Sequence, residues 1–391
     1  MGVKRVDVFV TPLRGHVQRM RPIVAALARR GLAVRVWTGA AAQRAFEAET
    51  HQLPGVDTVD LDSFPPPCRY VTHAAEQAPR LAEALQTDLI VYDQFAVIGR
   101  VLGHRLQLPH VAVCAGHNRP PTKVHAQMAA RSWPRPSLAC RRAARELAES
   151  GLPDVSPFFY LRALSPDLNL CSEPPEFLPP DERAGFEPLA FFGSQPSLPA
   201  PTRGRGVYVA LGTLALAHYR KPVHAFLRTL IGVLADRGEP ALVSLGGGAS
   251  PDLGGRGVRV ESFVDQQAAL RDARFFVTHH GLNSTHEAIA HGVPMLSAPL
   301  FADQPDLALR CQRFGIALPL GHPRVQPVEA ERIHAVLDEA GAREDELHAA
   351  LARARAWEER VIAGRDAVID RMLSLARDSG GERLTAHPAP L

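Results

Sequence analysis

The chain has 391 residues, of which 46% are hydrophobic and 22% charged, and a formal net charge of +3. This length and hydrophobic content favour two folded domains, and disorder is not expected. So small a net charge lacks the basic excess typical of nucleic-acid-binding proteins. We therefore expect a globular protein that binds no nucleic acid, and a small, locally charged substrate is compatible with this charge.

The cysteines and the N-terminal residues indicate the cellular compartment in which the protein acts. The five cysteines are an odd number, scattered and without a Cys-x-x-Cys pair, which favours a reducing compartment over a disulfide framework or a zinc site. The apolar run Val6–Val10 carries Asp7 and is far shorter than a signal-peptide core or a membrane span. We predict a cytoplasmic protein that is neither secreted nor membrane-spanning.

Strand-length apolar runs alternate with helical patterns along most of the chain. The first series runs through VDVFVTP, RPIVAALARRG, AVRVWTG, DLIVYD, AVIGRVLGHRL and HVAVCAG. After a proline-rich interval from Pro175 to Pro201, a second series runs through GVYVALGT, ALVSLGGG, VRVESF, ARFFVTHH and VPMLSAPL. Such alternation is typical of parallel βαβ units, so the sequence predicts an α/β protein with two doubly wound domains.

The domain limits are placed where composition changes. The N-terminal domain is predicted at residues 1–192 and the C-terminal domain at 207–343, joined by a linker at 193–206 where prolines and glycines disfavour regular structure. Residues 344–378 are rich in Ala, Leu, Glu and Arg with helical spacing, which predicts one long C-terminal helix that packs back toward the N-terminal domain. Residues 379–391 predict a loose tail.

The segment ARFFVTHHGLNSTHEAIAHG has the features of an anion-binding turn. A buried strand is predicted to end at Thr278, and a helix to begin near Ser284 after a polar turn that contains Gly281. The first turn of such a helix offers unpaired N–H groups and the positive end of the helix dipole. An alternative that needs no ligand is a capping box, in which Ser284 and Glu287 satisfy the helix N-terminus themselves.

Three neighbouring features favour a ligand. His279 stands at the strand end, the strand-length run VPMLSAPL follows the helix, and the polar pair Asp303 and Gln304 lies beyond that run. Open α/β sheets bind ligands at the carboxyl ends of their strands. Together, FVDQ and THHGLNSTHEAIAHGVPMLSAPLFADQ resemble the donor-binding signature of the UDP-glycosyltransferase superfamily, which includes plant natural-product and bacterial antibiotic and macrolide glycosyltransferases.

This resemblance implies the GT-B fold, in which two Rossmann-like doubly wound parallel-sheet domains face a central cleft. The N-terminal domain would bind the acceptor and the C-terminal domain the nucleotide-sugar donor. Two departures from the family pattern leave the preferred base open, because Asp265 replaces the usual proline and Phe263 replaces the tryptophan of plant members.

The resemblance also implies which residues hold the donor, from its base to its sugar. Gly15 and Gly281 are included in this donor-binding set, Gly281 because it lets the backbone approach a ligand closely. The other members are Phe263 and Val264 at the base, Gln266 and Glu287 at the ribose, Thr213, His279, Asn283 and Ser284 at the diphosphate, and Asp303 and Gln304 at the transferred sugar.

The N-terminal TPLRGHVQRMRP resembles the superfamily's Gly-His, which places a general base beside the acceptor. An acceptor hydroxyl is a poor nucleophile until a base takes its proton, and His16 would be that base. Asp93, at the end of DLIVYD, would hold the second ring nitrogen of His16. The alternatives are that His16 only packs in a loop and that Asp93 only caps a helix.

Two patterns are weighed against other functions. His286-Glu287 with His291 nearly matches the zinc motif His-Glu-x-x-His, but five residues of spacing turn the second ring roughly 140° away on a helix, so no metal is expected. The basic interval Arg119–Arg145, which includes Trp133, is interpreted as a solvated face, with a surface for an anionic acceptor or a peripheral membrane contact as the alternative.

The sequence therefore predicts an inverting, metal-independent glycosyltransferase without a cofactor, acting as a monomer or homodimer. It would move a sugar from a UDP- or TDP-sugar to a hydroxyl of a small, natural-product-like acceptor. The alternatives are a transferase for glycolipid or cell-wall precursors, a sugar-nucleotide epimerase, and a non-catalytic partner of a transferase.

Overall fold

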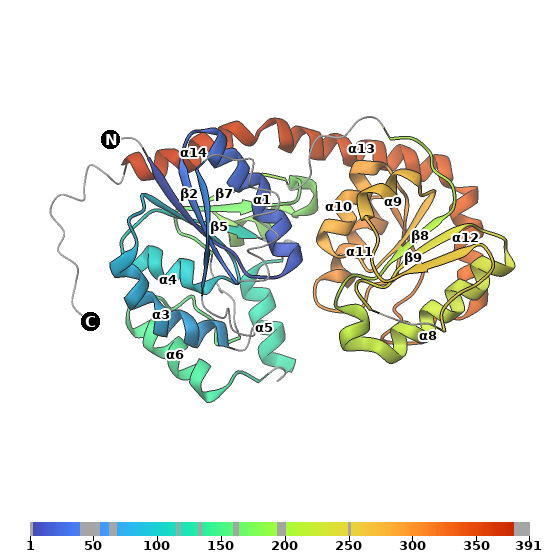
Figure 1. The fold of residues 1–391 in the computed structure, drawn as a ribbon, viewed down its shortest axis with the longest axis horizontal. Coiled ribbons are helices and arrows are strands. Elements are labelled where there is room, and N and C mark those ends of the chain that lie inside the picture. The colour runs from blue at the N-terminus through green and yellow to red at the C-terminus, as the bar shows by residue number, and fades with distance from the viewer. Residues whose placement is uncertain are drawn as a thin grey trace. The chain divides into compact units, whose positions relative to one another are not determined.

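A computed structural model of the chain divides into two compact units (Figure 1). Unit 1 comprises Met1–Ser194 and Ala363–Leu391, and unit 2 comprises Gln195–Ile362. The residues that the structure describes are 3–39, 55–61, 69–114, 116, 119–131, 135–158, 164–193, 201–248 and 252–378.

The described part of unit 1 forms a seven-stranded parallel sheet in the order β3-β2-β1-β4-β5-β6-β7. The central strands are apolar and buried along their whole length, as parallel sheets covered on both faces require. The strands are β1 (Arg5–Phe9), β2 (Ala33–Thr38), β3 (Val56–Asp60), β4 (Leu89–Asp93), β5 (His110–Cys114), β6 (Leu168–Cys171) and β7 (Leu189–Phe191). Its helices are α1 (Arg14–Arg29), α3 (Tyr70–Ala84), α4 (Val97–Arg105), α5 (Pro121–Arg131), α6 (Leu138–Glu149), α7 (Pro180–Arg183) and α14 (Arg365–Asp378).

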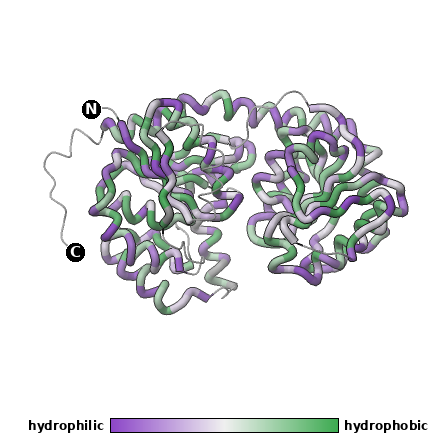
Figure 2. The backbone as a smooth tube through the Cα atoms, in the orientation of Figure 1, coloured by the Kyte–Doolittle hydropathy of each residue, from purple (hydrophilic) through white to green (hydrophobic). Residues whose placement is uncertain are grey.

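The described part of unit 2 forms a six-stranded parallel sheet in the order β10-β9-β8-β11-β12-β13, which is the doubly wound order 3-2-1-4-5-6. Figure 2 shows hydrophobic residues gathered on its strands. The strands are β8 (Val207–Ala210), β9 (Ala241–Ser244), β10 (Val258–Glu261), β11 (Phe275–Thr278), β12 (Met295–Ser297) and β13 (Ala317–Pro319). The helices are α8 (Ala215–Asp236), α9 (Gln266–Asp272), α10 (Leu282–His291), α11 (Gln304–Arg313), α12 (Ala330–Ala342) and α13 (Glu344–Ala363).

The predicted α/β class with two doubly wound parallel sheets is confirmed. In each sheet the strand order reverses between the first and fourth strands of the unit, which are β1 and β4 in unit 1 and β8 and β11 in unit 2. The carboxyl ends of these neighbouring strands meet at one edge, where doubly wound sheets bind their ligands. Both candidate sites described below lie at these switch points.

The C-terminal segment differs from the single long helix that the sequence predicts. It forms α13 and α14, which are separated at Gly364. Helix α13 buries Leu347 in the core of unit 2, so this unit extends past the predicted limit at residue 343. Helix α14 instead buries Ile369 and Met372 in the core of unit 1. The predicted linker includes the division between Ser194 and Gln195, but residues 194–200, like the predicted tail, lie outside the described residues.

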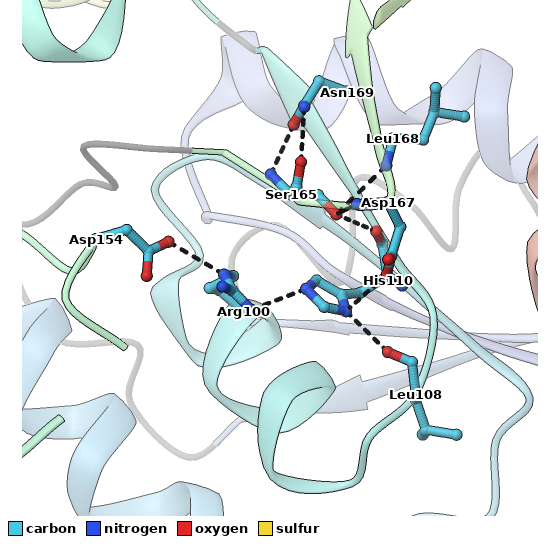
Figure 3. A network of polar contacts seen from close by, with 8 residues as sticks. All are labelled: Arg100, Leu108, His110, Asp154, Ser165, Asp167, Leu168 and Asn169. Carbon is cyan, nitrogen blue, oxygen red and sulfur yellow. Dashed lines mark hydrogen bonds and ion pairs between the residues drawn. The ribbon is translucent and has the colours of Figure 1, made fainter. Parts of the chain in front are cut away.

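A buried polar network fixes the amino end of β5 (Figure 3). Nδ1 of His110 donates to the carbonyl of Leu108 at 2.8 Å, so its Nε2 accepts from the guanidinium of Arg100 at 2.9 Å. Arg100 in turn donates to Asp154 at 3.1 Å, and Asp167 accepts from the backbone N–H of His110 at 2.9 Å. Burial lowers the pKa of His110 and outweighs the opposing hydrogen bond and carboxylates. The neutral histidine is therefore part of the fold.

The sequence predicts neither a membrane span nor a disulfide framework. Within the described ranges, no helix has the length and apolar content needed to cross a membrane. Cys114, Cys140, Cys171 and Cys311 are buried, whereas Cys68 lies outside the described residues.

Candidate active site

The switch point of unit 1 brings His16 and Asp93 together. His16 lies in the first turn of α1, which follows β1, and Asp93 is the last residue of the adjacent β4. Nδ1 of His16 lies 3.2 Å from Oδ1 of Asp93; the Asp93 side chain is fully buried, while that of His16 is 12% exposed. With Nδ1 at the carboxylate, Nε2 lies on the opposite edge of the ring. This is the arrangement that orients a histidine as a general base.

Asp93 is held by the backbone around it as well as by His16. It accepts hydrogen bonds from the hydroxyl of Thr11 at 2.9 Å and from the backbone N–H groups of Thr11, Phe95 and Ala96. Burial on its own would raise the pKa of Asp93, but the attraction of His16 and these hydrogen bonds lower it below its ordinary value. Asp93 therefore stabilises the turn before α4, whose N-cap is Ala96, and also contacts His16.

An aromatic ring lies beside His16. The ring of Phe95 lies 5.0 Å from that of His16, centroid to centroid, and the side chain of Leu13 is 37% exposed. Gly15 occupies the first turn of α1 in unit 1, whereas every other predicted donor residue lies in unit 2. No role was predicted from the sequence for Phe95 or Thr11, although Thr11 begins the stretch TPLRGHVQRMRP.

The switch point of unit 2 carries His279 between two glycines. A Cβ atom at Gly212, after β8, or at Gly281, the N-cap of α10, would lie 2.5 Å from Nε2 of His279. Gly212 also has a left-handed φ of 81°, whereas Gly281 has an ordinary φ of −61°. Gly281 is therefore required for space and not for backbone conformation. It makes room for the His279 ring, a role that the sequence prediction did not include.

His279 is buried without an acidic partner. Burial lowers its pKa to about 4, against the opposing effect of a hydrogen bond with the backbone of Ala210. Its Nδ1 is buried and makes no hydrogen bond with any described residue. Since buried polar atoms are nearly always paired, this nitrogen is suited to meet a ligand. The next residue, His280, has a φ of 60° and is fixed by Ser297 at 2.8 Å and Thr285 at 3.2 Å.

Three of the predicted donor residues form one cluster. Nε2 of Gln266, at the start of α9, donates to Oγ of Ser284 at 3.1 Å and also to the carboxylate of Glu287. Oε1 of Gln266 accepts from the hydroxyl of Tyr208 at 3.4 Å. The capping-box alternative is wrong, because Gly281 is the N-cap of α10 and Ser284 bonds to Gln266. Asn283, beside Ser284 in the first turn of α10, lies at the same edge.

The residues predicted at the base precede this cluster. Phe263 is 50% exposed, an unusual state for a large aromatic side chain, and Val264 is partly buried. Asp265 is the N-cap of α9 and accepts from the backbone N–H groups of Gln267 at 3.0 Å and Ala268 at 3.2 Å. The departure from the family's proline is thus explained, since an aspartate caps the helix that presents Gln266.

Thr213 is exposed and opens onto a cavity of about 260 Å³. The turn after β9, which lines the cavity, is rich in glycine, and a Cβ atom at Gly246 would lie 2.5 Å from the carbonyl oxygen of Gly212. Sequence reasoning missed this turn, although the run LGGG signalled it. The cavity is lined by Thr213, Leu216, Ala217, Arg220, Leu245, Gly246, Gly247 and Gly248.

The loop after β12 carries Asp303 and Gln304. Gln304 is buried, and its Oε1 accepts from the backbone N–H groups of Leu300 at 2.9 Å and Phe301 at 3.1 Å. Its oxygen therefore holds the loop, which leaves the amide nitrogen for a ligand. Asp303 occupies the N-cap position of α11 but makes no capping bond through its side chain.

The residues of the near-zinc motif are engaged elsewhere. Nδ1 of His286 contacts the carboxylate of Glu358 on α13, and both side chains are buried. Nε2 of His291 lies 2.7 Å from Oε1 of Gln267. Across the part of the chain that the structure describes, no group of three or more His, Cys, Asp or Glu side chains is placed to hold a metal ion.

Part of the charge in the basic interval is neutralised locally. Lys123 pairs with Glu182 at 2.6 Å, and Arg142 on α6 pairs with Glu146 one turn later at 2.8 Å. These pairs are typical of a solvated helix face. Trp133 lies outside the described residues.

Comparisons with known proteins agree with the sequence resemblance. A family model described as UDP-glucoronosyl and UDP-glucosyl transferase matches residues 202–326. UDP-glucuronosyltransferase 2B9 of Macaca fascicularis is 37% identical over 95 residues, which are 24% of this chain and 18% of that protein. UDP-glucuronosyltransferase 3A2 of Homo sapiens is 53% identical over 67 residues, which are 16% of this chain and 13% of that protein. The chain thus spans less than a fifth of the length of these curated relatives.

Solved structures match over nearly the whole chain. The glycotransferase of kitacinnamycin has a TM-score of 0.74 at 24% identity, covering 94% of this chain and 99% of that one. The glycosyltransferase VinC in complex with DTDP has a TM-score of 0.65 at 19% identity, covering 96% and 100%. The chain therefore has the fold of GT-B glycosyltransferases. The predicted resemblance to UDP-glycosyltransferases is confirmed, with the family match in unit 2.

Proposed function

We propose that the protein is an inverting glycosyltransferase that moves a sugar from a UDP- or TDP-sugar to a hydroxyl of a small acceptor. The observation that carries this proposal is the contact between His16 and Asp93 in a chain whose other unit has the donor signature. A protein that only binds nucleotide sugars has no need of a histidine oriented by a buried carboxylate. An epimerase acts on the nucleotide sugar alone, so it has no need of a base for the hydroxyl of a second substrate.

In the proposed reaction, the acceptor oxygen attacks the anomeric carbon from the face opposite the leaving group. Nε2 of His16 takes the hydroxyl proton as the new carbon–oxygen bond forms, and the bond from the anomeric carbon to the diphosphate oxygen breaks. The nucleoside diphosphate leaves with the bonding electrons. Asp93, whose pKa lies below its ordinary value, stays ionised and stabilises the imidazolium of His16.

Charge on the departing diphosphate would be met by the turn around His279. The N–H groups at the start of α10, the side chains of Asn283 and Ser284 and the hydroxyl of Thr213 are the proposed donors. Since these groups supply electrostatic stabilisation that a divalent cation supplies elsewhere, we propose that transfer needs no metal and no cofactor.

The comparisons support the proposed substrates. One matching structure is a complex with DTDP and one is a spinosyn rhamnosyltransferase complexed with spinosyn aglycone, while the sequence relatives are named UDP-glucuronosyltransferases. Phe263, smaller than tryptophan, is compatible with stacking on uracil or thymine. An apolar acceptor with a hydroxyl would suit the Phe95 ring beside His16. The odd number and scattered positions of the cysteines support action in the reducing cytoplasm.

The test is release of nucleoside diphosphate from UDP-, TDP- and GDP-sugars, measured with EDTA present, with and without a mixture of hydroxylated acceptors. We expect release that depends on acceptor, persists in EDTA and is lost in His16→Ala. No release with any donor from a protein that binds nucleotide would instead favour a non-catalytic partner.

A further inference from the structure

Helix α8 is kinked near its start. Tyr219 has φ −132° and ψ 39°, outside the helical region, and divides a first turn from the longer helix that follows. Pro222 explains the position of the kink, because its ring lacks an N–H and clashes with the carbonyl four residues earlier. The kink follows the turn that carries Gly212 and Thr213.

The side chain of Tyr219 lies between two other segments of unit 2. Its ring centroid is 5.2 Å from that of Phe301, which follows β12, and the two planes are inclined at 38°. The guanidinium carbon of Arg324, which follows β13, is 4.8 Å from the centroid of the Tyr219 ring. Arg324 also donates to the carbonyl of Leu300 at 3.4 Å. We call Phe301, Tyr219 and Arg324 the loop clamp.

The loop that the clamp contacts has a backbone that needs support. Ala302 has a left-handed φ of 56°, which is unfavourable for a residue with a Cβ atom. Oε1 of Gln304 supports the loop from inside through Leu300 and Phe301, as described above. The loop clamp supports it from the side of α8. Asp303 follows Ala302 directly, so its direction depends on this strained turn.

We propose that Tyr219 is a positioning residue for the donor sugar, resting on the proposed function. It holds the left-handed turn at Ala302, which aims Asp303 and the amide nitrogen of Gln304 at the hydroxyls of the transferred sugar. The base and ribose end of the donor lies far from the clamp. Phe263 and Gln266 follow β10, and strands β9, β8 and β11 lie between β10 and β12 in the sheet. At roughly 4.8 Å per strand spacing, the ends of β10 and β12 are roughly 19 Å apart along the sheet.

The experiment compares titrations of UDP and TDP with those of UDP-glucose and TDP-glucose, by calorimetry on the full chain. We expect Tyr219→Leu to weaken nucleotide-sugar binding about tenfold, the loss of one aromatic pair and one cation–π contact, and to change nucleotide affinity less than about twofold. Tyr219→Phe keeps the ring and should bind both as the wild type does. Arg324→Met, at an exposed position, should show a smaller loss for the sugar form alone.

A matched control removes another ring pair of unit 2. Trp357 and Phe314 lie 5.0 Å apart, so Trp357→Leu should lower stability without changing the ratio of the two affinities. Equal weakening of nucleotide and nucleotide sugar in Tyr219→Leu and Arg324→Met, or no change in either, would overturn the inference. A wild-type protein that binds no nucleotide would overturn the proposed function and this inference with it. If the wild type binds nucleotide and the variants keep its ratio of nucleotide to nucleotide-sugar affinity, only the inference is overturned and the proposed function stands.

Discussion

The two units place a histidine at corresponding edges of similar sheets and surround it differently. His16 follows the first strand of unit 1 and contacts the carboxylate of Asp93. His279 follows the fourth strand of unit 2, is buried between two glycines, and has a pKa lowered to about 4. The fold brings strand ends together in both units, and the neighbouring residues decide the chemistry. In the proposed reaction, His16 takes a proton and His279 stays neutral beside the diphosphate.

Replacing the carboxylate of Asp93 should remove the support that His16 receives in unit 1. We expect Asp93→Asn to lower kcat about 1000-fold, because the imidazolium loses its partner, while nucleotide affinity stays within about twofold. Rates with saturating donor and acceptor, together with calorimetry, measure both. Thermal unfolding is needed as a check, because Asp93 also accepts backbone N–H groups. A variant that folds and retains the wild-type rate would refute the role of Asp93.

Filling the space around His279 should act on unit 2 alone. In Gly281→Ala the new Cβ displaces the His279 ring without backbone strain, and nucleotide affinity should fall roughly tenfold to 100-fold through loss of hydrogen bonds to a charged group. Gly232→Ala is the matched control, since Gly232 lies inside α8 with nothing within 4 Å of the added methyl group. That variant should bind nucleotide normally. An unchanged nucleotide affinity in Gly281→Ala would show that His279 is not part of the nucleotide site.

Buried neutral histidines should make the fold sensitive to acid. The pKa is lowered to about 4 for His279 and about 3 for His280, below the value of 6.5 in the unfolded chain. Below pH 6.5 these histidines take up protons in the unfolded state but stay neutral in the folded state. The free energy of unfolding therefore falls as the pH falls. Between pH 7 and pH 5 the loss should be about 2 kcal/mol for each of these two histidines.

Urea unfolding across that pH range measures this slope. His110→Gln should make it shallower, because burial lowers the pKa of His110 in the same direction. A stability that is constant from pH 7 to pH 5 would show that these imidazoles are protonated in the folded state.

The smallest effect concerns the helix that presents Gln266. Asp265→Ala removes the N-cap of α9 and should cost about 1 kcal/mol of unfolding free energy, with the His16 side of the chain unaffected. Urea unfolding checks the loss, and kcat should stay near the wild-type value. A large fall in kcat with unchanged stability would mean that Asp265 acts in the reaction itself.

The sequence predicted the features that are local or repeated. Parallel strands buried on both faces appear as apolar runs, so both sheets were predicted, and the turn from Thr278 into α10 was recognised from contiguous residues. The prediction failed where distant segments meet. The role of Gly281 depends on the position of the His279 ring, and the loop clamp joins Tyr219 to Phe301. The C-terminal segment is divided because its two halves pack in the cores of different units.

The most direct test of the central claim measures transfer rate and nucleotide affinity together in His16→Ala and Gly281→Ala. The account predicts that His16→Ala binds nucleoside diphosphate like the wild type and transfers no sugar, whereas Gly281→Ala loses nucleotide affinity. It would be contradicted if His16→Ala transferred sugar at the wild-type rate, or if both variants lost nucleotide binding alike.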